Sequence, residues 1–304
     1  MRVVVLGSAA GGGVPQWNCR CPVCRLAWAR DPRVSWRTQS SLAVSVDGRQ
    51  WLLLNASPDL RAQLAVVPAL HPREEPSGGG LRHSPIASVL ITNGDVDHVA
   101  GLLNLRESQP FSIYGTRETL DVIGGNRIFD VVSQDLVPRV ALDLDVPREI
   151  LPGLEVELFA VPGKVPLWLE EGDVAVGTES GATVGAVLSG NGRRMVYVPG
   201  CAEAHEGVLA RLRGADLLLF DGTLFRDDEM IRSGTGGKTG RRMGHMPMSG
   251  PGGTLEVLAD LPVARKVFIH INNTNPALIA GSPERGQVEE AGWQIASDAM
   301  EFDL

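Results

Sequence analysis

Ile86-Ala87-Ser88-Val89-Leu90-Ile91-Thr92 is a nearly all-apolar run, and Asn93-Gly94-Asp95-Val96-Asp97-His98 follows it directly. An apolar run without alternation predicts a β-strand that is buried on both faces, as in the parallel sheets of α/β proteins. Ligand-binding residues gather in the loops that such strands position. The sequence therefore predicts an α/β architecture with a polar site directly after this strand.

Patterns of the same kind recur along the chain. Short apolar or β-branched runs predict further strands at Arg2–Leu6, Leu42–Val46, Trp51–Asn55, Leu154–Val161, Thr183–Ser189, Arg194–Val198, Leu217–Asp221, Lys266–Ile271 and Trp293–Ala296. Helical spacing predicts helices at Pro58–Ala69, directly after His98, and at Ala204–Leu212, Thr254–Leu261 and Ser282–Ala291. The segment His71–Pro85, rich in Pro, Gly and charge, is predicted to be a loop.

Two pairs of these strands are joined by dipeptides typical of β-hairpins, Asp47-Gly48 and Asn191-Gly192. Hairpins mixed with βα units fit neither a Rossmann sheet nor a TIM barrel. They favour two mixed sheets with helices outside. We expect one domain over residues 1–304, since no linker divides the chain.

Composition excludes several classes of protein. The 304 residues carry 28 Lys and Arg against 36 Asp and Glu, a net charge of −8, so no basic face is available to bind a nucleic acid backbone. A hydrophobic content of 43% supports a sizeable core and argues against intrinsic disorder. No apolar run approaches the roughly 20 residues that span a bilayer, and no signal peptide is recognised. We expect a soluble cytoplasmic protein.

Three of the four cysteines, Cys19, Cys21 and Cys24, lie within one loop, residues 17–25. Clustered thiols in a cytoplasmic protein more often bind a metal than form disulfides. The Cys-x-Cys-x-x-Cys spacing suits a tetrahedral Zn²⁺ with one further ligand, and three thiolates favour a structural role for the ion. Three reduced, buried thiols are the alternative interpretation.

Asp97, His98 and His270 form a second candidate metal site. His270 follows the apolar strand at Lys266–Ile271, as Asp97 and His98 follow the strand at Ile86–Thr92. Two imidazoles and one carboxylate suit Zn, Mn or Fe, and this set leaves one face of an iron(II) ion open. A capped turn at residues 93–98 and a buried core histidine at 270 are the alternatives.

Polar groups elsewhere complete the candidate site. Asp221 ends an apolar strand and is expected to orient a histidine. Lys238 and Arg241 lie in a basic, glycine-rich loop and could bind substrate carboxylates, although a solvated loop explains them equally well. The glycines of residues 7–13 lack the helix and the acidic residue of a dinucleotide site, so we interpret them as a turn.

Six motifs occur in an order found in one known family. They are Gly7–Gly13, Pro15–Cys19, Asn55–Asp59, Asp221–Leu224, Lys238–Arg241 and His270–Pro276. Over essentially its full length the chain resembles the family of pyrroloquinoline quinone (PQQ) biosynthesis protein B, within the metallo-β-lactamase superfamily. The resemblance implies an αββα sandwich, two mixed sheets flanked by helices, with metal at the sheet edges.

The chain departs from the superfamily's metal pattern, His-x-His-x-Asp-His. Asn93 and Asp95 stand where the histidines of the first metal are expected, and residues 198–201 hold no bridging carboxylate. Asp97, His98 and His270 match the ligands of the second metal. One metal is therefore expected, and hydrolysis by a hydroxide that bridges two metals is not.

The resemblance implies a role in making the redox cofactor PQQ from a Glu/Tyr-derived peptide precursor. We expect an iron(II)-dependent hydroxylase of the tyrosine ring, with Fe²⁺ on Asp97, His98 and His270 and Zn²⁺ able to replace it. Asp95 or His245 would move protons, and Lys238 and Arg241 would hold substrate carboxylates. Cys19, Cys21 and Cys24 resemble the zinc loop of related superfamily members. Those members have a further His shortly after the metal-binding His of the late strand, and this chain has Asn273 at that place.

Two other functions fit the same residues. A carrier would bind PQQ or its precursor without turnover, for delivery toward export. A single-zinc hydrolase would cleave the precursor peptide without oxygen. Other PQQ-pathway proteins are the expected partners, and a homodimer is one possible assembly.

Overall fold

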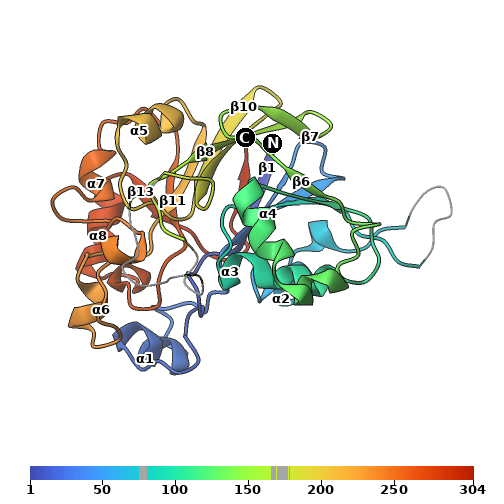
Figure 1. Ribbon diagram of the computed structural model, residues 1–304. Coiled ribbons are helices and arrows are strands. Elements are labelled where there is room, and N and C mark those ends of the chain that lie inside the picture. Colours follow the sequence, from blue (N-terminus) through green and yellow to red (C-terminus); the bar gives the residue numbers. More distant parts are fainter. Residues whose placement is uncertain (75–80, 166–168, 170–176, 178) are drawn as a thin grey trace.

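Two seven-stranded β-sheets form the body of the protein in the computed structural model, which describes residues 1–74, 81–165, 169, 177 and 179–304 (Figure 1). The first sheet has the order β14 (Glu301–Asp303), β1 (Arg2–Gly7), β2 (Ser41–Ser45), β3 (Trp51–Leu54), β4 (Ile86–Leu90), β5 (Ser112–Gly115) and β6 (Arg139–Ala141). The second has the order β13 (Trp293–Ile295), β12 (Lys266–Ile269), β11 (Leu217–Asp221), β10 (Arg193–Val198), β9 (Val184–Gly190), β8 (Leu154–Ala160) and β7 (Arg148–Leu151). Each sheet has three antiparallel pairs at one end, which include β1–β2–β3 and β7–β8–β9, and three parallel pairs at the other.

Helices lie on the two outer sides (Figure 1). Apolar side chains of α2 (Leu60–Val66), α3 (Val96–Val99) and α4 (Arg117–Gly124) pack on the first sheet. Those of α1 (Pro22–Trp28), α5 (Glu206–Leu212), α7 (Thr254–Val257) and α8 (Pro283–Glu290) pack on the second. The chain also forms α6 (Glu229–Arg232) and short 3₁₀ turns at Pro68–Leu70, Ala100–Leu105, Arg127–Val131, Arg241–Met243 and Pro276–Leu278.

The strands bury both faces because successive side chains point to opposite sides of a sheet. On β1, Val3 and Val5 belong to the core between the sheets, whereas Val4 and Leu6 belong to the core beneath the helices. The predicted αββα sandwich of two mixed sheets is confirmed.

The strand predicted from Ile86 onward and both predicted hairpins are also confirmed. β4 lies between two parallel neighbours, β3 and β5, as its apolar sequence requires. Asn191 and Gly192 both have positive φ, 54° and 69°, in the two-residue turn between β9 and β10. Such angles are those of a type I′ turn, which matches the twist of the strands that it joins.

Several element boundaries differ from the prediction. The helix predicted over Pro58–Ala69 is interrupted at Val67, which is extended because it precedes Pro68. The helix expected after His98 begins two residues earlier, so Asp97 and His98 lie on α3 itself. Short elements of three to eight residues were not predicted: α1, β5, α4, β6, β7, α6 and β14. Residues 75–80 of the loop predicted at His71–Pro85 lie outside the described residues.

Backbone contacts fix α3 against the segment that follows β3. The Ala56 N–H donates to the His98 carbonyl at 2.8 Å, and the Gly101 N–H donates to the Ala56 carbonyl at 2.8 Å. A Cβ atom at Gly101 would lie 2.1 Å from the Ser57 carbonyl oxygen, far inside van der Waals contact. Only glycine therefore allows α3, and with it Asp97 and His98, to approach this closely.

The Gly101→Ala substitution should destabilise the protein and displace α3. Backbone must move to relieve the clash, so we expect a loss of about 2 kcal/mol or more in the free energy of unfolding, measured with denaturant. Gly286→Ala is the matched control, because Gly286 lies within α8 with nothing near its Cβ position. That control should be neutral or more stable by up to about 1 kcal/mol. Equal effects of the two substitutions would contradict this account of α3.

Candidate functional site

The polar residues predicted from the strand ends lie around one cavity of about 530 Å³. Its wall includes the segment after β4 with Asn93, Asp95, Asp97 and His98. It also includes Pro199 and Gly200 after β10, Thr223 after β11 and His270 after β12. The carboxyl ends of parallel strands from both sheets thus lie at a common edge, which is where ligands bind in α/β proteins.

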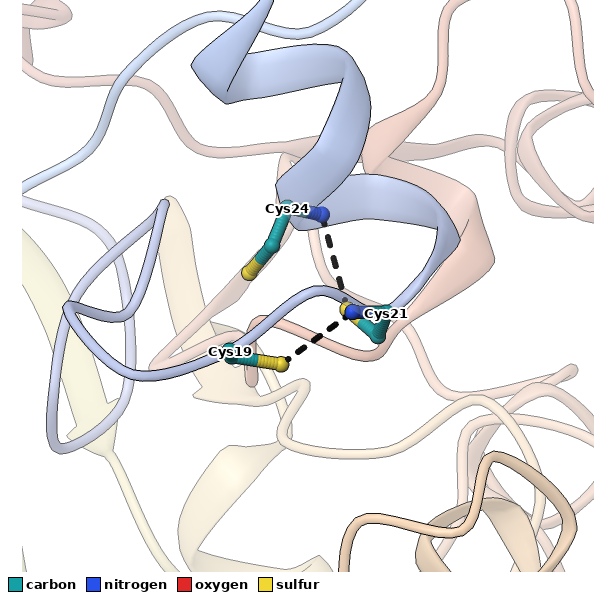
Figure 2. Close-up of side chains that lie close together, drawn as sticks. All are labelled: Cys19, Cys21 and Cys24. Carbon is teal, nitrogen blue, oxygen red and sulfur yellow. Dashed lines mark hydrogen bonds between the residues drawn. The ribbon is translucent and has the colours of Figure 1, made fainter.

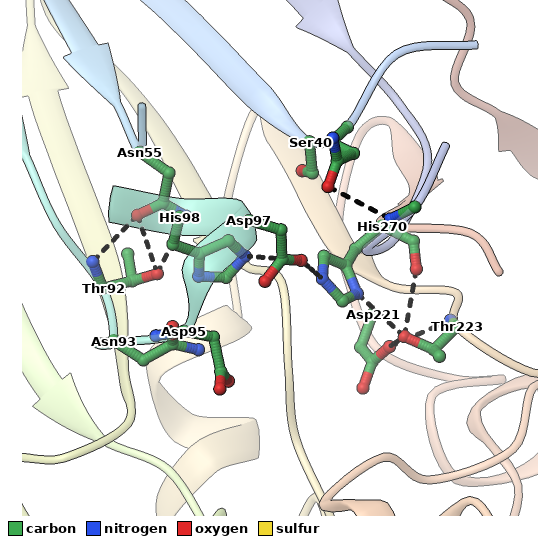
Figure 3. A network of polar contacts seen from close by, with 12 residues as sticks. Ser40, Asn55, Thr92, Asn93, Asp95, Asp97, His98, Asp221, Thr223 and His270 are labelled. Carbon is green, nitrogen blue, oxygen red and sulfur yellow. Dashed lines mark hydrogen bonds and ion pairs between the residues drawn. The ribbon is translucent and has the colours of Figure 1, made fainter. Parts of the chain in front are cut away.

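Asp97, His98 and His270 form a compact group at this edge (Figure 3). Their potential ligand atoms all lie within 4.8 Å of one another. The Asp97 Oδ2 atom lies 3.1 Å from His270 Nε2 and 3.9 Å from His98 Nε2. The structure therefore brings together the two imidazoles and one carboxylate predicted from the sequence.

His98 shows why this group fits a metal ion. Its side chain is only 2% exposed, yet neither ring nitrogen has a hydrogen-bond partner. Buried polar atoms of native proteins are almost always paired, so an orphaned imidazole beside a carboxylate points to an ion as its missing partner. Burial lowers the pKa of His98, which keeps the ring neutral and able to coordinate.

The charge states of the other two residues are set by their contact. Burial alone would raise the pKa of Asp97, but His98 and the hydrogen bond with His270 outweigh it and hold that pKa below its usual range. Burial likewise opposes protonation of His270, whose pKa is nevertheless raised overall by Asp97. Asp97 is thus an anionic group that needs a cation.

Thr223 holds His270 from the side opposite Asp97 (Figure 3). Its Oγ1 lies 2.9 Å from His270 Nδ1 and 3.0 Å from the His270 carbonyl oxygen. The contact occupies Nδ1 and directs Nε2 toward Asp97. Outer contacts of this kind orient histidine ligands in metal sites. His270 also has a left-handed backbone, φ 58°, which turns its side chain out of the strand direction.

Asp221 and His245 form a pair beside the same site. The His245 Nδ1 atom lies 2.7 Å from Asp221 Oδ2, and its ring stacks on His270 with centroids 5.3 Å apart. Asp221 also accepts from the Cys201 N–H, the Thr223 N–H and the Thr223 hydroxyl. These contacts fill its acceptor positions, so Asp221 serves better to orient His245 than to bind a metal, although its ligand atoms lie within 4.8 Å of those of His245 and His270.

The three clustered cysteines face one another in a second group (Figure 2). The Cys21 N–H donates to Cys19 Sγ and the Cys24 N–H to Cys21 Sγ, both at 3.4 Å. All three are free thiols with at most 9% exposure. The hydrogen bond between the two thiols lowers the pKa of Cys24 to about 6 and raises the pKa of Cys21, so Cys24 is the first of the pair to form a thiolate.

Comparison with known proteins identifies the family. A model of the beta-lactamase superfamily domain matches residues 50–271. The chain is 59% identical to a coenzyme PQQ synthesis protein B of Methylobacterium radiotolerans over the full length of both. It is 53% identical to that of Gluconacetobacter diazotrophicus over 98% of each. The chain belongs to the coenzyme PQQ synthesis protein B family.

A solved member of this family has nearly the same structure. The crystal structure of Zn²⁺-bound PqqB from Methylobacterium extorquens superposes with a TM-score of 0.97, at 58% identity over the whole of both chains. A diphosphatase of the PhnP family, 21% identical, has a TM-score of 0.68 over 99% of this chain and 97% of its own, which shows a shared fold alone. In the described part of the present chain, no helix is long and apolar enough to cross a membrane.

The two basic residues predicted to bind substrate lie in different places. Lys238 lines the cavity. Arg241 is not among the residues that line it, since its guanidinium donates to the carbonyls of Gly252, at 3.0 Å, and Ala202, at 3.5 Å. The loop turns at Thr239 and Gly240, between Lys238 and Arg241. The basic residues of the loop do not predict this turn.

Sequence reasoning missed three residues that contribute to the cavity. Gly11 brings the N-terminal loop beside Asp97, where a Cβ atom would lie in ordinary contact, 3.5 Å from the carboxylate. Lys164 adds a second cation to the wall, and Thr223 holds His270. Lys164 carried no pattern in the sequence, but Thr223 stands in the same motif as Asp221, two residues on.

A buried carboxyl supports the wall of the cavity from behind. Glu229 is 7% exposed and accepts from the Phe225 N–H at 2.7 Å and the Thr274 hydroxyl at 2.6 Å. Thr274 in turn accepts from the side chain of Asn272, which lines the cavity. Burial raises the pKa of Glu229 from 4.5 to about 7.

The Glu229→Gln variant should therefore gain stability relative to the parent protein as the pH rises from about 5 to about 8. Between the ordinary pKa of 4.5 and the raised value near 7, the unfolded chain loses this proton first, so the free energy of unfolding of the parent falls. Thermal unfolding at about pH 5 and about pH 8 should show the variant gaining up to about 3 kcal/mol over the parent.

Glu155→Gln, at an exposed position, is the control and should leave the pH profile of the parent unchanged. A Glu229→Gln variant whose stability tracks the parent at both pH values would contradict the raised pKa.

Proposed function

We propose that this chain takes part in PQQ biosynthesis as an iron(II)-dependent oxygenase that hydroxylates the tyrosine ring of a Glu-Tyr-derived precursor. One observation carries the proposal. Asp97, His98 and His270 form a group of two imidazoles and one carboxylate at the wall of a large cavity, with the buried His98 ring unpaired. This ligand set is typical of non-haem iron oxygenases, and it leaves coordination positions open.

The residues beside the group support one metal rather than two. Asn93 and Asp95 stand where the superfamily pattern has histidines, and the side-chain oxygen of Asn93 accepts from the Asp95 N–H at 3.0 Å. Cys201, in the segment expected to supply a bridging carboxylate, gives the site only its backbone N–H, which bonds Asp221. A bridging hydroxide between two ions therefore lacks its ligands.

Fe²⁺ held by Asp97, His98 and His270 would supply the activation of O₂, with two electrons from an external reductant and one oxygen atom leaving as water. The chain's own residues would position the substrate and move protons. His245, held at Nδ1 by Asp221, would accept the phenol proton, and Asp95 also lines the cavity. Lys238, on the same wall, would bind a substrate carboxylate.

We assign Zn²⁺ to Cys19, Cys21 and Cys24. Their spacing and mutual approach support this assignment, as does the solved relative, which is described as Zn²⁺-bound. The cytoplasmic location, the contacts with other pathway proteins and the homodimer stay predictions from the sequence.

The reaction is tested by mass spectrometry of a Glu-Tyr peptide. Protein loaded anaerobically with Fe²⁺ is mixed with peptide and ascorbate, and then exposed to oxygen. We expect the peptide to gain oxygen on its tyrosine ring, since the cavity holds both the metal ligands and the groups that would bind the peptide. His270→Ala should abolish the gain, whereas His71→Ala, outside this cavity, should not.

Two outcomes would contradict the oxygenase. An unchanged peptide that binds tightly to iron-loaded protein would favour the carrier. A cleaved peptide, formed equally well without oxygen, would favour the hydrolase.

Lys238 should act on substrate binding rather than on the chemical step. Loss of one charged hydrogen bond corresponds to about 1.5–3 kcal/mol, so Lys238→Met should raise KM by about tenfold or more with little change in kcat. Arg241→Met should change KM by less than about threefold, because its guanidinium bonds backbone carbonyls away from the cavity. Equal KM values for Lys238→Met and the parent would refute the carboxylate contact.

A further inference from the structure

Three tryptophans around α1 expose large apolar side chains to solvent. Trp17, in the loop before the helix, is 82% exposed, and Trp28 and Trp36 are 46% and 44% exposed. Trp17 belongs to the motif Pro15–Cys19 but is not among the residues that line the cavity. In Figure 1, α1 lies at the lower edge of the molecule. Tryptophan is strongly enriched among the residues that carry binding energy at protein interfaces, which indicates a binding surface here.

Trp28 and Trp36 are held in place by their own indole N–H groups. The Trp28 Nε1–H donates to the Cys19 carbonyl at 3.1 Å, and the Trp36 Nε1–H donates to the Ala27 carbonyl at 2.8 Å. The two rings meet edge to face, with centroids 5.6 Å apart. Both polar atoms are thus satisfied within the chain, and the rings present apolar surface to solvent in a preset position.

Arginines lie beside these two rings. The guanidinium carbon of Arg30 lies 3.6 Å from the centroid of the Trp36 ring, which is a cation–π contact. Arg30 has a left-handed backbone, φ 55°, a conformation that glycine usually supplies at the end of a helix, so the chain places an arginine here at a conformational cost. Arg25 and Trp28 are three residues apart on α1 and therefore occupy the same face of the helix.

The positive charge of this segment is largely unpaired. Of the exposed arginines between residues 20 and 33, Arg33 has a carboxylate partner, Asp31, at 2.9 Å. Asp31 is the only acidic residue in that stretch of sequence. Arg20, Arg25 and Arg30 form no ion pair within the described part of the chain. A local cationic surface therefore stands on a chain whose net charge is −8.

Charge decides which partner this surface fits. An acidic chain would supply carboxylates to the three unpaired guanidinium groups, and its apolar side chains would cover the rings. A second copy of this protein that met the surface across a two-fold axis would instead set arginine against arginine. A long nucleic acid would be repelled by the negative charge elsewhere on the protein. We call this surface the Trp–Arg patch and define it as Trp17, Arg20, Arg25, Trp28, Arg30 and Trp36.

We propose that the Trp–Arg patch is the docking site for an acidic, extended protein segment that carries aromatic or other apolar side chains. The inference goes beyond the proposed function and does not depend on the oxygenase reaction. No residue of the patch is among those that line the cavity. Binding of a partner at the patch and binding of a substrate in the cavity can therefore be measured separately.

Fluorescence anisotropy of a labelled Asp-Phe repeat peptide tests the proposal on the full chain. We expect the peptide to bind, and to bind more weakly as the salt concentration rises, because salt screens the attraction between its carboxylates and the arginines. The double substitution Arg25→Glu and Arg30→Glu reverses two charges of the patch and should weaken binding by about tenfold or more. Trp17→Ser removes exposed apolar surface alone and should weaken binding by about threefold or more.

Matched controls separate the patch from the rest of the protein. Arg49→Glu with Arg148→Glu, at exposed positions outside the patch, changes the net charge equally, and this variant should bind the peptide like the parent. Lys238→Met should also bind it like the parent, because Lys238 belongs to the cavity. A Lys-Phe repeat peptide has the same rings with the opposite charge and should not bind.

Three results would overturn the proposal. The first is a parent protein that does not bind the Asp-Phe peptide, or that binds it no better than the Arg25→Glu and Arg30→Glu variant does. The second is a thymidine oligonucleotide that binds the patch more tightly than the peptide, which would assign the patch to nucleic acid. The third is a parent dimer in sedimentation equilibrium that the same double substitution dissociates, which would assign the patch to a second copy of this chain. A missing product in the oxygen assay would leave all these measurements unaffected.

Discussion

The hydroxyl group of Thr223 connects the parts of the site that come from different strands. It donates to the carboxylate of Asp221 at 2.7 Å and lies within 3.1 Å of ring nitrogens of both His245 and His270. Because β11 and β12 are parallel neighbours in register, Thr223 and His270 leave the sheet side by side. One small side chain thereby sets the rotation of two imidazoles, and a larger residue there would separate them.

The group around Asp97 is unfavourable without an ion. Leaving a buried polar atom unpaired costs about 1–3 kcal/mol, and His98 has two such atoms. Strain and unpaired groups of this kind are typical of functional sites, where a ligand supplies the missing partner.

Local sequence patterns predicted those features that depend on neighbours in the chain. The apolar run before Asn93 fixed the place of Asp97 and His98, and the spacing of Cys19, Cys21 and Cys24 indicated their grouping. The contacts of Asn273 could not be predicted from local sequence patterns, because the cysteines that it contacts lie about 250 positions earlier in the chain. They come together only when the N-terminal loop packs against the segment that follows β12. The course of the loop that carries Arg241 was not predictable for a similar reason, because it depends on Asp227, whose carboxylate accepts from the Arg241 N–H.

The two sheets each supply only part of the candidate iron ligands. Asp97 and His98 follow a strand of the first sheet, and His270 follows a strand of the second. An ion held by residues from both sheets binds the folded chain and not the unfolded one. By mass action it therefore adds about 2.7 kcal/mol to the free energy of unfolding when its concentration is 100 times its dissociation constant. Metal supply would then govern how long the protein survives proteolysis in the cell. Starvation for the ion would lower the amount of the protein as well as its activity.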